Sequence, residues 1–110
     1  MLEKEFVPYQ ESLELKELGF DEPCLSYYEG ESFSYHLQSM TSGDDYIIPA
    51  PLYQQAFRWF REKYILIYVI VKAESWFFTI NGCNTQEGFK TYEEAELACL
   101  KKLIEIVKNK

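Results

Sequence analysis

The sequence predicts an α+β fold: two β-hairpins form a mostly antiparallel sheet of about four strands, packed with three helices in the order α-β-β-α-β-β-α. Two pairs of β-prone segments, each pair separated by turn-forming residues, indicate the hairpins. Capping residues and helical spacing of apolar residues indicate the helices. Because 110 residues leave no room for two cores, the whole chain (1–110) is expected to be a single cooperative domain.

The first helix is expected from about Pro8 to Leu18, because proline suits a first helical turn and Gly19 can end a helix. With Gly19 in the left-handed conformation, Phe20 falls where it can cover Leu15. The pattern therefore predicts a Schellman motif with its hydrophobic contact.

The first hairpin is expected from Cys24 to Tyr28 and from Phe33 to Gln38, on either side of the turn-forming stretch Glu29 to Ser32. In the second strand apolar and polar residues alternate, so one face should be buried and the other wet. His36 falls on the wet face. It is the only histidine, which excludes any mechanism that needs two.

The second helix is expected from about Pro51 to Tyr64, after a stiff entry over Pro49-Ala50-Pro51. Its apolar face spans an arc of roughly 160° and contains Leu52, Tyr53, Ala56, Phe57, Trp59, Phe60 and Tyr64. The opposite side carries Gln54, Arg58 and Arg61, a modest anion-attracting patch that a solvated helix face also explains.

The second hairpin is expected from Ile65 to Val71 and from Trp76 to Ile80, with Lys72 to Ser75 between them. The first of these strands is rich in β-branched residues and is apolar at both its odd and its even positions. Such a strand is either central under two layers or an edge strand covered by a partner.

The third helix is expected to begin at Thr91, whose spacing to Glu94 matches a capping box. Its apolar residues cover an arc of roughly 200° or more, wider than one contact face requires. The helix is therefore expected to touch two surfaces. These are either the sheet and the first helix, or the sheet and the same helix of a second subunit.

The composition favours a folded protein with an acidic surface, since 47% of the residues are hydrophobic and 17% aromatic. Eighteen acidic against eleven basic residues give a net charge of -7, which repels phosphate backbones and anionic lipids. The longest apolar run, Ile65 to Val71, is too short to span a bilayer. The first residues lack the pattern of a signal peptide, so the protein is expected in the cytoplasm.

No residue set in the sequence predicts catalysis, a metal site or a cofactor. Cys24, Cys83 and Cys99 contain no CxxC pair and are expected to be reduced and buried as small core residues. Asp44 and Asp45 lack the spacing of an EF-hand. The five glycines are scattered rather than gathered in a phosphate-binding loop.

Several segments carry a resemblance to known proteins. They are Phe6-Val7-Pro8-Tyr9, Leu15 to Cys24, Gln55 to Tyr64 and Thr91 to Leu100. On these segments the chain resembles a group of small uncharacterised proteins from gut Bacteroides-type bacteria and their phages or prophages. The resemblance covers all three helices. It implies a bacterial or phage cytoplasmic origin and carries no assigned activity or catalytic residues.

The leading hypothesis is a non-enzymatic interaction protein, an accessory factor of a phage or prophage, whose partner is another protein or a second copy of itself. Its self-association surface is predicted on the second hairpin and the third helix, with residues Ile65, Ile67, Val69, Val71, Leu97, Leu100, Ile104 and Val107. The alternative is a small nucleic-acid or nucleotide-associated module that uses Arg58 and Arg61, with Gln54 nearby.

Overall fold

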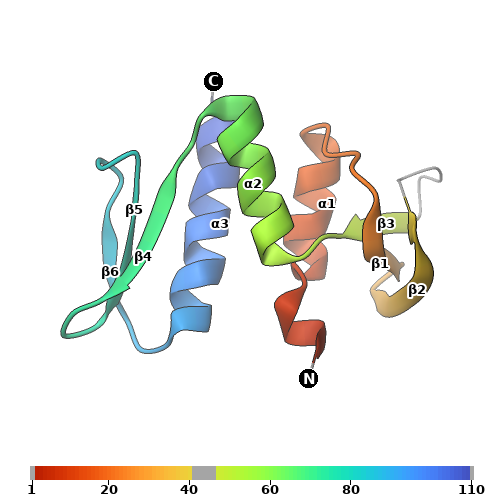
Figure 1. Ribbon diagram of the computed structural model, residues 1–110, viewed down its shortest axis with the longest axis horizontal. Coiled ribbons are helices and arrows are strands. Elements are labelled where there is room, and N and C mark those ends of the chain that lie inside the picture. The colour runs from red at the N-terminus through yellow and green to blue at the C-terminus, as the bar shows by residue number, and fades with distance from the viewer. Residues whose placement is uncertain (1, 41–46, 110) are drawn as a thin grey trace. The chain divides into compact units, whose positions relative to one another are not determined.

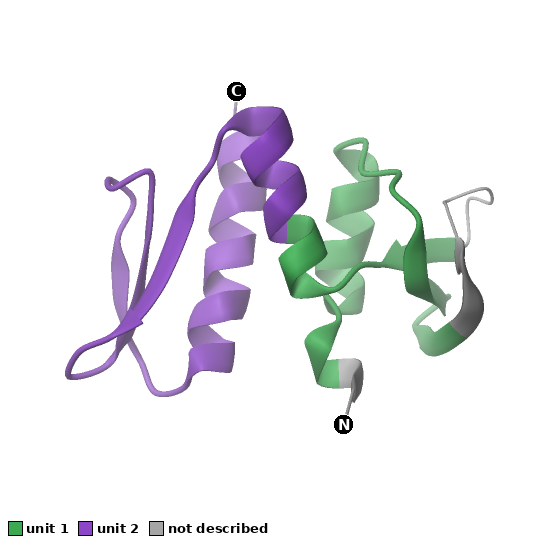
Figure 2. Cartoon of the chain, viewed as in Figure 1, with its two compact units in different colours: residues 1–56 green, residues 57–110 purple. Residues whose placement is uncertain are grey.

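The computed structural model describes residues 2–40 and 47–109, with the side chains of residues 4–35 and 47–109. It confirms the α+β class and the predicted order of elements (Figure 1). The strands form two three-stranded antiparallel sheets rather than one sheet of about four strands. The chain divides into two compact units, Met1–Ala56 and Phe57–Lys110 (Figure 2). Folding as one cooperative domain stays a prediction, because cooperativity is observed only on unfolding.

The helix of the first unit is α1 (Tyr9–Glu17), which follows the short 3-10 helix η1 (Leu2–Glu5). After α1, Gly19 has a φ of 101°, and the Phe20 amide donates to the Leu15 carbonyl at 2.9 Å. Leu15 and Phe20 are both buried. The predicted Schellman motif is therefore confirmed.

The first sheet has the order β2-β1-β3. Strands β1 (Cys24–Glu29) and β2 (Ser32–Met40) form the predicted hairpin, and Gly30 in its turn has a φ of 61°. The added strand β3 (Ile47–Ala50) pairs with the other side of β1, where the sequence predicts only a stiff helix entry around Pro49. Proline is tolerated in β3 because an edge strand does not need every N–H for the ladder.

Helix α2 (Tyr53–Tyr64) has most of the predicted buried face, with Ala56, Phe57 and Phe60 fully buried. The prediction is wrong for Leu52, which precedes the helix and is 36% exposed, and Tyr64 is half-buried. Arg58 is exposed on its polar side. The residues of α2 up to Ala56 belong to the first unit, and those from Phe57 belong to the second.

The second sheet, in the second unit, has the order β4-β5-β6 and is followed by α3 (Tyr92–Lys108). Its strands are β4 (Tyr68–Lys72), β5 (Trp76–Ile80) and β6 (Gln86–Phe89). Helix α3 packs against all three strands (Figure 1). Strand β6 is missed by the sequence analysis because Gln-Glu-Gly-Phe has weak strand propensity and three of its residues are exposed.

The start of α3 confirms the predicted cap. The Glu94 amide donates to Thr91 Oγ1 at 3.1 Å, and the Lys90 amide donates to the Glu94 carboxylate at 3.2 Å. The buried residues of α3 include Cys99, Leu100 and Ile104. Among the described residues, none of the helices has the length and apolar character that a bilayer crossing requires.

Candidate interaction surface

An exposed apolar stripe runs along β4 and the segment before it. We call it the β4 stripe, and it consists of Ile65, Ile67, Val69 and Val71, which are 70%, 51%, 48% and 39% exposed. From Ile67 onward the chain is paired along β5, so alternate side chains point to the same face. The stripe is therefore one parity of the apolar run that the sequence singles out.

The other parity of the same run lies in the core of the second unit. Leu66 is buried, and Tyr68 stacks on Phe57 with ring centroids 4.1 Å apart. Ile70 is half-buried and pairs with the fully buried Phe78 of β5. One face of the sheet is thus covered by helical residues, and the β4 stripe lies on the outer face.

The outer face becomes more polar from β4 towards β6. Val71 pairs with Phe77, and Val69 pairs with Thr79. The Thr85 hydroxyl donates to the Thr79 hydroxyl at 3.2 Å, and Glu87 in β6 is exposed. The apolar part of this face is therefore concentrated on the β4 side of the sheet.

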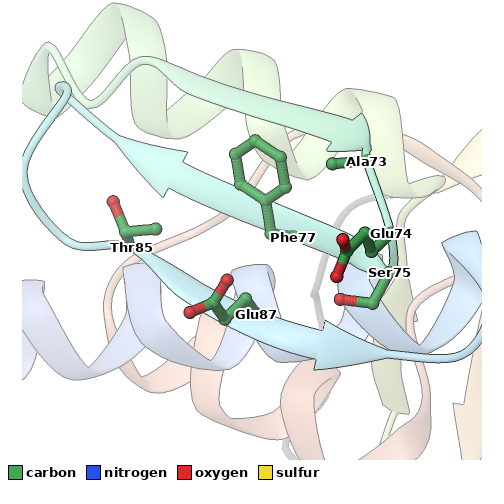
Figure 3. A pocket seen from close by; sticks show the side chains of 6 residues that line it. All are labelled: Ala73, Glu74, Ser75, Phe77, Thr85 and Glu87. Atoms are coloured by element: carbon green, nitrogen blue, oxygen red, sulfur yellow. The ribbon is translucent and has the colours of Figure 1, made fainter.

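An open hollow of about 440 Å³ lies on this outer face beside the β4–β5 turn (Figure 3). It is lined by Ala73, Glu74, Ser75, Phe77, Thr85 and Glu87. Ser75 Oγ accepts a hydrogen bond from the Gly88 amide at 3.1 Å, which ties β6 to the turn. The polar groups of its lining are two hydroxyls and two carboxylates, which belong to Ser75, Thr85, Glu74 and Glu87.

The backbone at the start of the β4 stripe is strained. Ile65 has a φ of 57°, a left-handed conformation that is a genuine outlier for a β-branched residue. Asn81, itself at a φ of 53°, donates from Nδ2 to the Ile65 carbonyl at 3.3 Å. Its Oδ1 accepts from the Ile67 amide at 2.9 Å. The Asn81 side chain, which directly follows β5, therefore fixes the backbone at Ile65 and Ile67 by two hydrogen bonds.

Replacing Ile65 with glycine is expected to raise the free energy of unfolding of the monomer by about 1 kcal/mol, because glycine removes the left-handed strain that isoleucine suffers there. Little burial is lost, since the side chain is 70% exposed. Urea denaturation at low protein concentration measures the change. Ile67→Gly is the matched control and should destabilise the chain, because Ile67 does not have a positive φ. A loss of stability in Ile65→Gly would contradict the assignment of strain.

Strand β4 is an edge strand without the usual protection against pairing. In the described part of the chain it has a strand neighbour on one side only, β5. Natural edges are commonly protected by proline, charged residues or bulges. Of its five residues, Lys72 at the end is the only charged one, and no proline or glycine occurs among them. The opposite edge strand, β6, contains Glu87 and Gly88.

Burial raises the pKa of two cysteines and of Tyr92. Burial, with a smaller contribution from the Glu96 carboxylate, raises the pKa of Cys99 to about 12. Burial, then Glu96, with further contributions from Tyr68 and Cys99, raises the pKa of Tyr92 to about 12. Burial, then Glu22, raises the pKa of Cys24 to about 12. Both thiols are therefore protonated at neutral pH and are not nucleophiles.

The predicted burial of all three cysteines is confirmed for Cys24 and Cys99 and is wrong for Cys83. Cys83 follows Gly82 in the exposed β5–β6 turn, where no core reaches it. We expect one rapidly reacting thiol per native chain with a thiol-specific reagent at neutral pH, and three in denaturant. Rapid reaction of a Cys83→Ser variant would contradict this expectation.

The predicted self-association residues fall into two groups. The four residues of the β4 stripe are exposed, as a surface requires. In α3, Leu100 and Ile104 are buried and Leu97 and Val107 are half-buried. The α3 residues are largely not available on the surface because the helix packs against β4, β5 and β6. The structure does not bring them together with the stripe on the outer face.

The residues of the alternative hypothesis lie on α2. Gln54, Arg58 and Arg61 are all exposed, with Gln54 in the first unit and the two arginines in the second. Arg61 lies near Tyr68: burial and the nearby Cys99 and Glu96 raise the pKa of Tyr68, and Arg61 opposes them.

The side chains of two further candidates from the sequence analysis cannot be placed in the structure. The His36 side chain and the Asp44-Asp45 pair are outside the described residues. Among the side chains that are described, no three His, Cys, Asp or Glu residues lie where they could hold a metal ion. Comparisons with protein-family models, with curated proteins and with solved structures find no match for this chain.

Proposed function

We propose that this is a non-enzymatic interaction protein that self-associates through the β4 stripe. The observation that carries the proposal is a row of four exposed β-branched side chains, two on the edge strand β4 and two on the segment that leads into it, with no protecting proline or glycine in β4. The strained Ile65 supports it, because a costly backbone conformation that displays an apolar side chain to water is typical of a functional site. An accessory role in a phage or prophage stays a prediction from the resemblance.

A second copy of this chain fits the stripe better than an unlike partner of opposite charge. The segment from Ile65 to Val71 has no charged side chain and is followed by Lys72, although the whole chain carries a net charge of -7. Two acidic copies repel at long range. Contact over a surface without acidic residues adds no close carboxylate pairs to this repulsion, and the segment provides such a surface.

The expected affinity is modest. The stripe residues are between 39% and 70% exposed, so even full burial would add only about 1 kcal/mol per side chain. This upper limit, about 8 kcal/mol for eight side chains in two copies, is comparable to the roughly 4–15 kcal/mol cost of association. We therefore expect a concentration-dependent dimer rather than an obligate one.

Light scattering over a series of protein and salt concentrations tests the proposal. The average mass should rise from monomer towards dimer as the protein concentration increases. It should rise further with added salt, because salt screens the repulsion between two acidic copies. A monomer mass throughout the series would refute self-association.

A further inference from the structure

Backbone hydrogen bonds at both ends of the β4–β5 hairpin determine which amides of β4 face β5. At one end the Asn81 amide donates to the Ile67 carbonyl at 2.8 Å. At the other end the Ala73 amide donates to the Ser75 carbonyl at 2.9 Å. The register of the two strands is unbroken between these points. In an antiparallel ladder, hydrogen-bonded and non-hydrogen-bonded pairs alternate.

Because the two kinds of pair alternate, every second residue of β4, counted from Ile67 or from Ala73, is hydrogen-bonded to β5. Val69 and Val71 belong to the pairs that are hydrogen-bonded to β5. The N–H and C=O groups of Tyr68, Ile70 and Lys72 then point to the open edge of the sheet. The backbone N–H donors and C=O acceptors of these three residues therefore have the spacing that an added strand requires.

We propose that β4 pairs antiparallel with β4 of a second copy, about a two-fold axis at Ile70. This inference rests on the self-association proposed above and specifies its geometry. Ile70 lies opposite Ile70 of the second copy, and Tyr68 lies opposite its Lys72, so every edge-facing group of β4 has a partner. This register overlaps all five residues of both strands and joins the two sheets into one of six strands.

The side chains and charges favour this edge pairing over stacking of the two outer faces. The axis at Ile70 places Val69 opposite Val71 of the second copy, so apolar residues of the two stripes are neighbours across the joint. The acidic β6 strands, which carry Glu87, lie at the two far ends of the joined sheet. Stacking the outer faces would instead bring the carboxylates of Glu74 and Glu87 towards those of the other copy.

Cysteine pairing in mixed samples tests the register. In a Cys83→Ser background, Val69→Cys and Val71→Cys are prepared separately and then combined. Opposed residues of a non-hydrogen-bonded pair have Cα atoms about 4.5 Å apart, within disulfide range. Identical residues in this register lie diagonally, about 7–8 Å apart, which is beyond that range.

Under mild oxidation we expect disulfide-linked dimers in the mixture, up to the fraction of mixed dimers that random association of the two variants gives. Each variant alone should form several-fold fewer linked dimers. Equal linkage in the mixture and in the single variants would overturn the register. Absence of linkage, with a mass that still rises with concentration, would overturn edge pairing and leave the proposed function standing. A monomer at all concentrations would overturn both.

Discussion

Replacing Val69 and Val71 together with lysine should leave the fold intact and weaken self-association by about 100-fold or more. Both side chains are exposed on the outer face, so the monomer loses little packing. In the proposed register each new ammonium group lies opposite another one, and like charges directly opposed destabilise strand pairs. Lost apolar contact adds to this, for a total of about 3 kcal/mol. Sedimentation equilibrium of parent and variant measures the difference.

Leu25→Lys provides the matched control for this double variant. Leu25 is also a strand residue and is 50% exposed, but it belongs to β1 in the first unit. The control should associate like the parent. A lysine double variant that associates as strongly as the parent would show that another surface carries the contact.

Leu15→Ala should lower the free energy of unfolding by about 3 kcal/mol, the usual cost of truncating a buried leucine. Leu15 is fully buried in the first unit, whereas the two tryptophans, Trp59 and Trp76, lie in the second. If the chain unfolds as one cooperative domain, tryptophan fluorescence will report the loss. Urea titrations followed by fluorescence and by far-UV circular dichroism provide the measurement.

The exposed Leu25 again supplies the control, because Leu25→Ala should change stability by only a few tenths of a kcal/mol. Coincident transitions by both probes in Leu15→Ala would support one cooperative domain. An unchanged fluorescence midpoint together with an earlier transition by circular dichroism would show two units that unfold independently.

The features that the sequence predicts correctly are those decided by near neighbours in the chain. Gly19 and Phe20 terminate α1 because one glycine and one apolar residue are enough to build the motif. Thr91 and Glu94 start α3 for the same local reason. Spacing along α2 likewise separates its buried and solvated faces.

The missed strands depend on residues that are distant in sequence. Strand β3 contains Pro49, and its pairing with β1 depends on a strand about twenty residues earlier in the chain. Strand β6 has a polar sequence and is held by β5 and by the Ser75 hydroxyl. Neither strand has the alternation or β-branched composition that marks a strand on its own.

The candidate surface was half predictable. The apolar run from Ile65 to Val71 indicates that two faces are apolar, but only the fold shows which face α3 leaves uncovered. The apolar arc of α3 suggests a second contact, yet Leu100 and Ile104 are already buried within the chain. The strain at Ile65 and the hydrogen bonds from Asn81 leave no signal in the sequence, because they depend on the hairpin register.

Hydrogen–deuterium exchange at low and high protein concentration tests most directly whether β4 carries the contact. We expect peptides covering Ile65 to Lys72 to become more protected as concentration rises, since the edge amides of Tyr68, Ile70 and Lys72 gain partners. Peptides from β1 should exchange at an unchanged rate. If the mass of the particle rises with concentration while exchange across Ile65 to Lys72 stays constant, β4 is not the site of self-association.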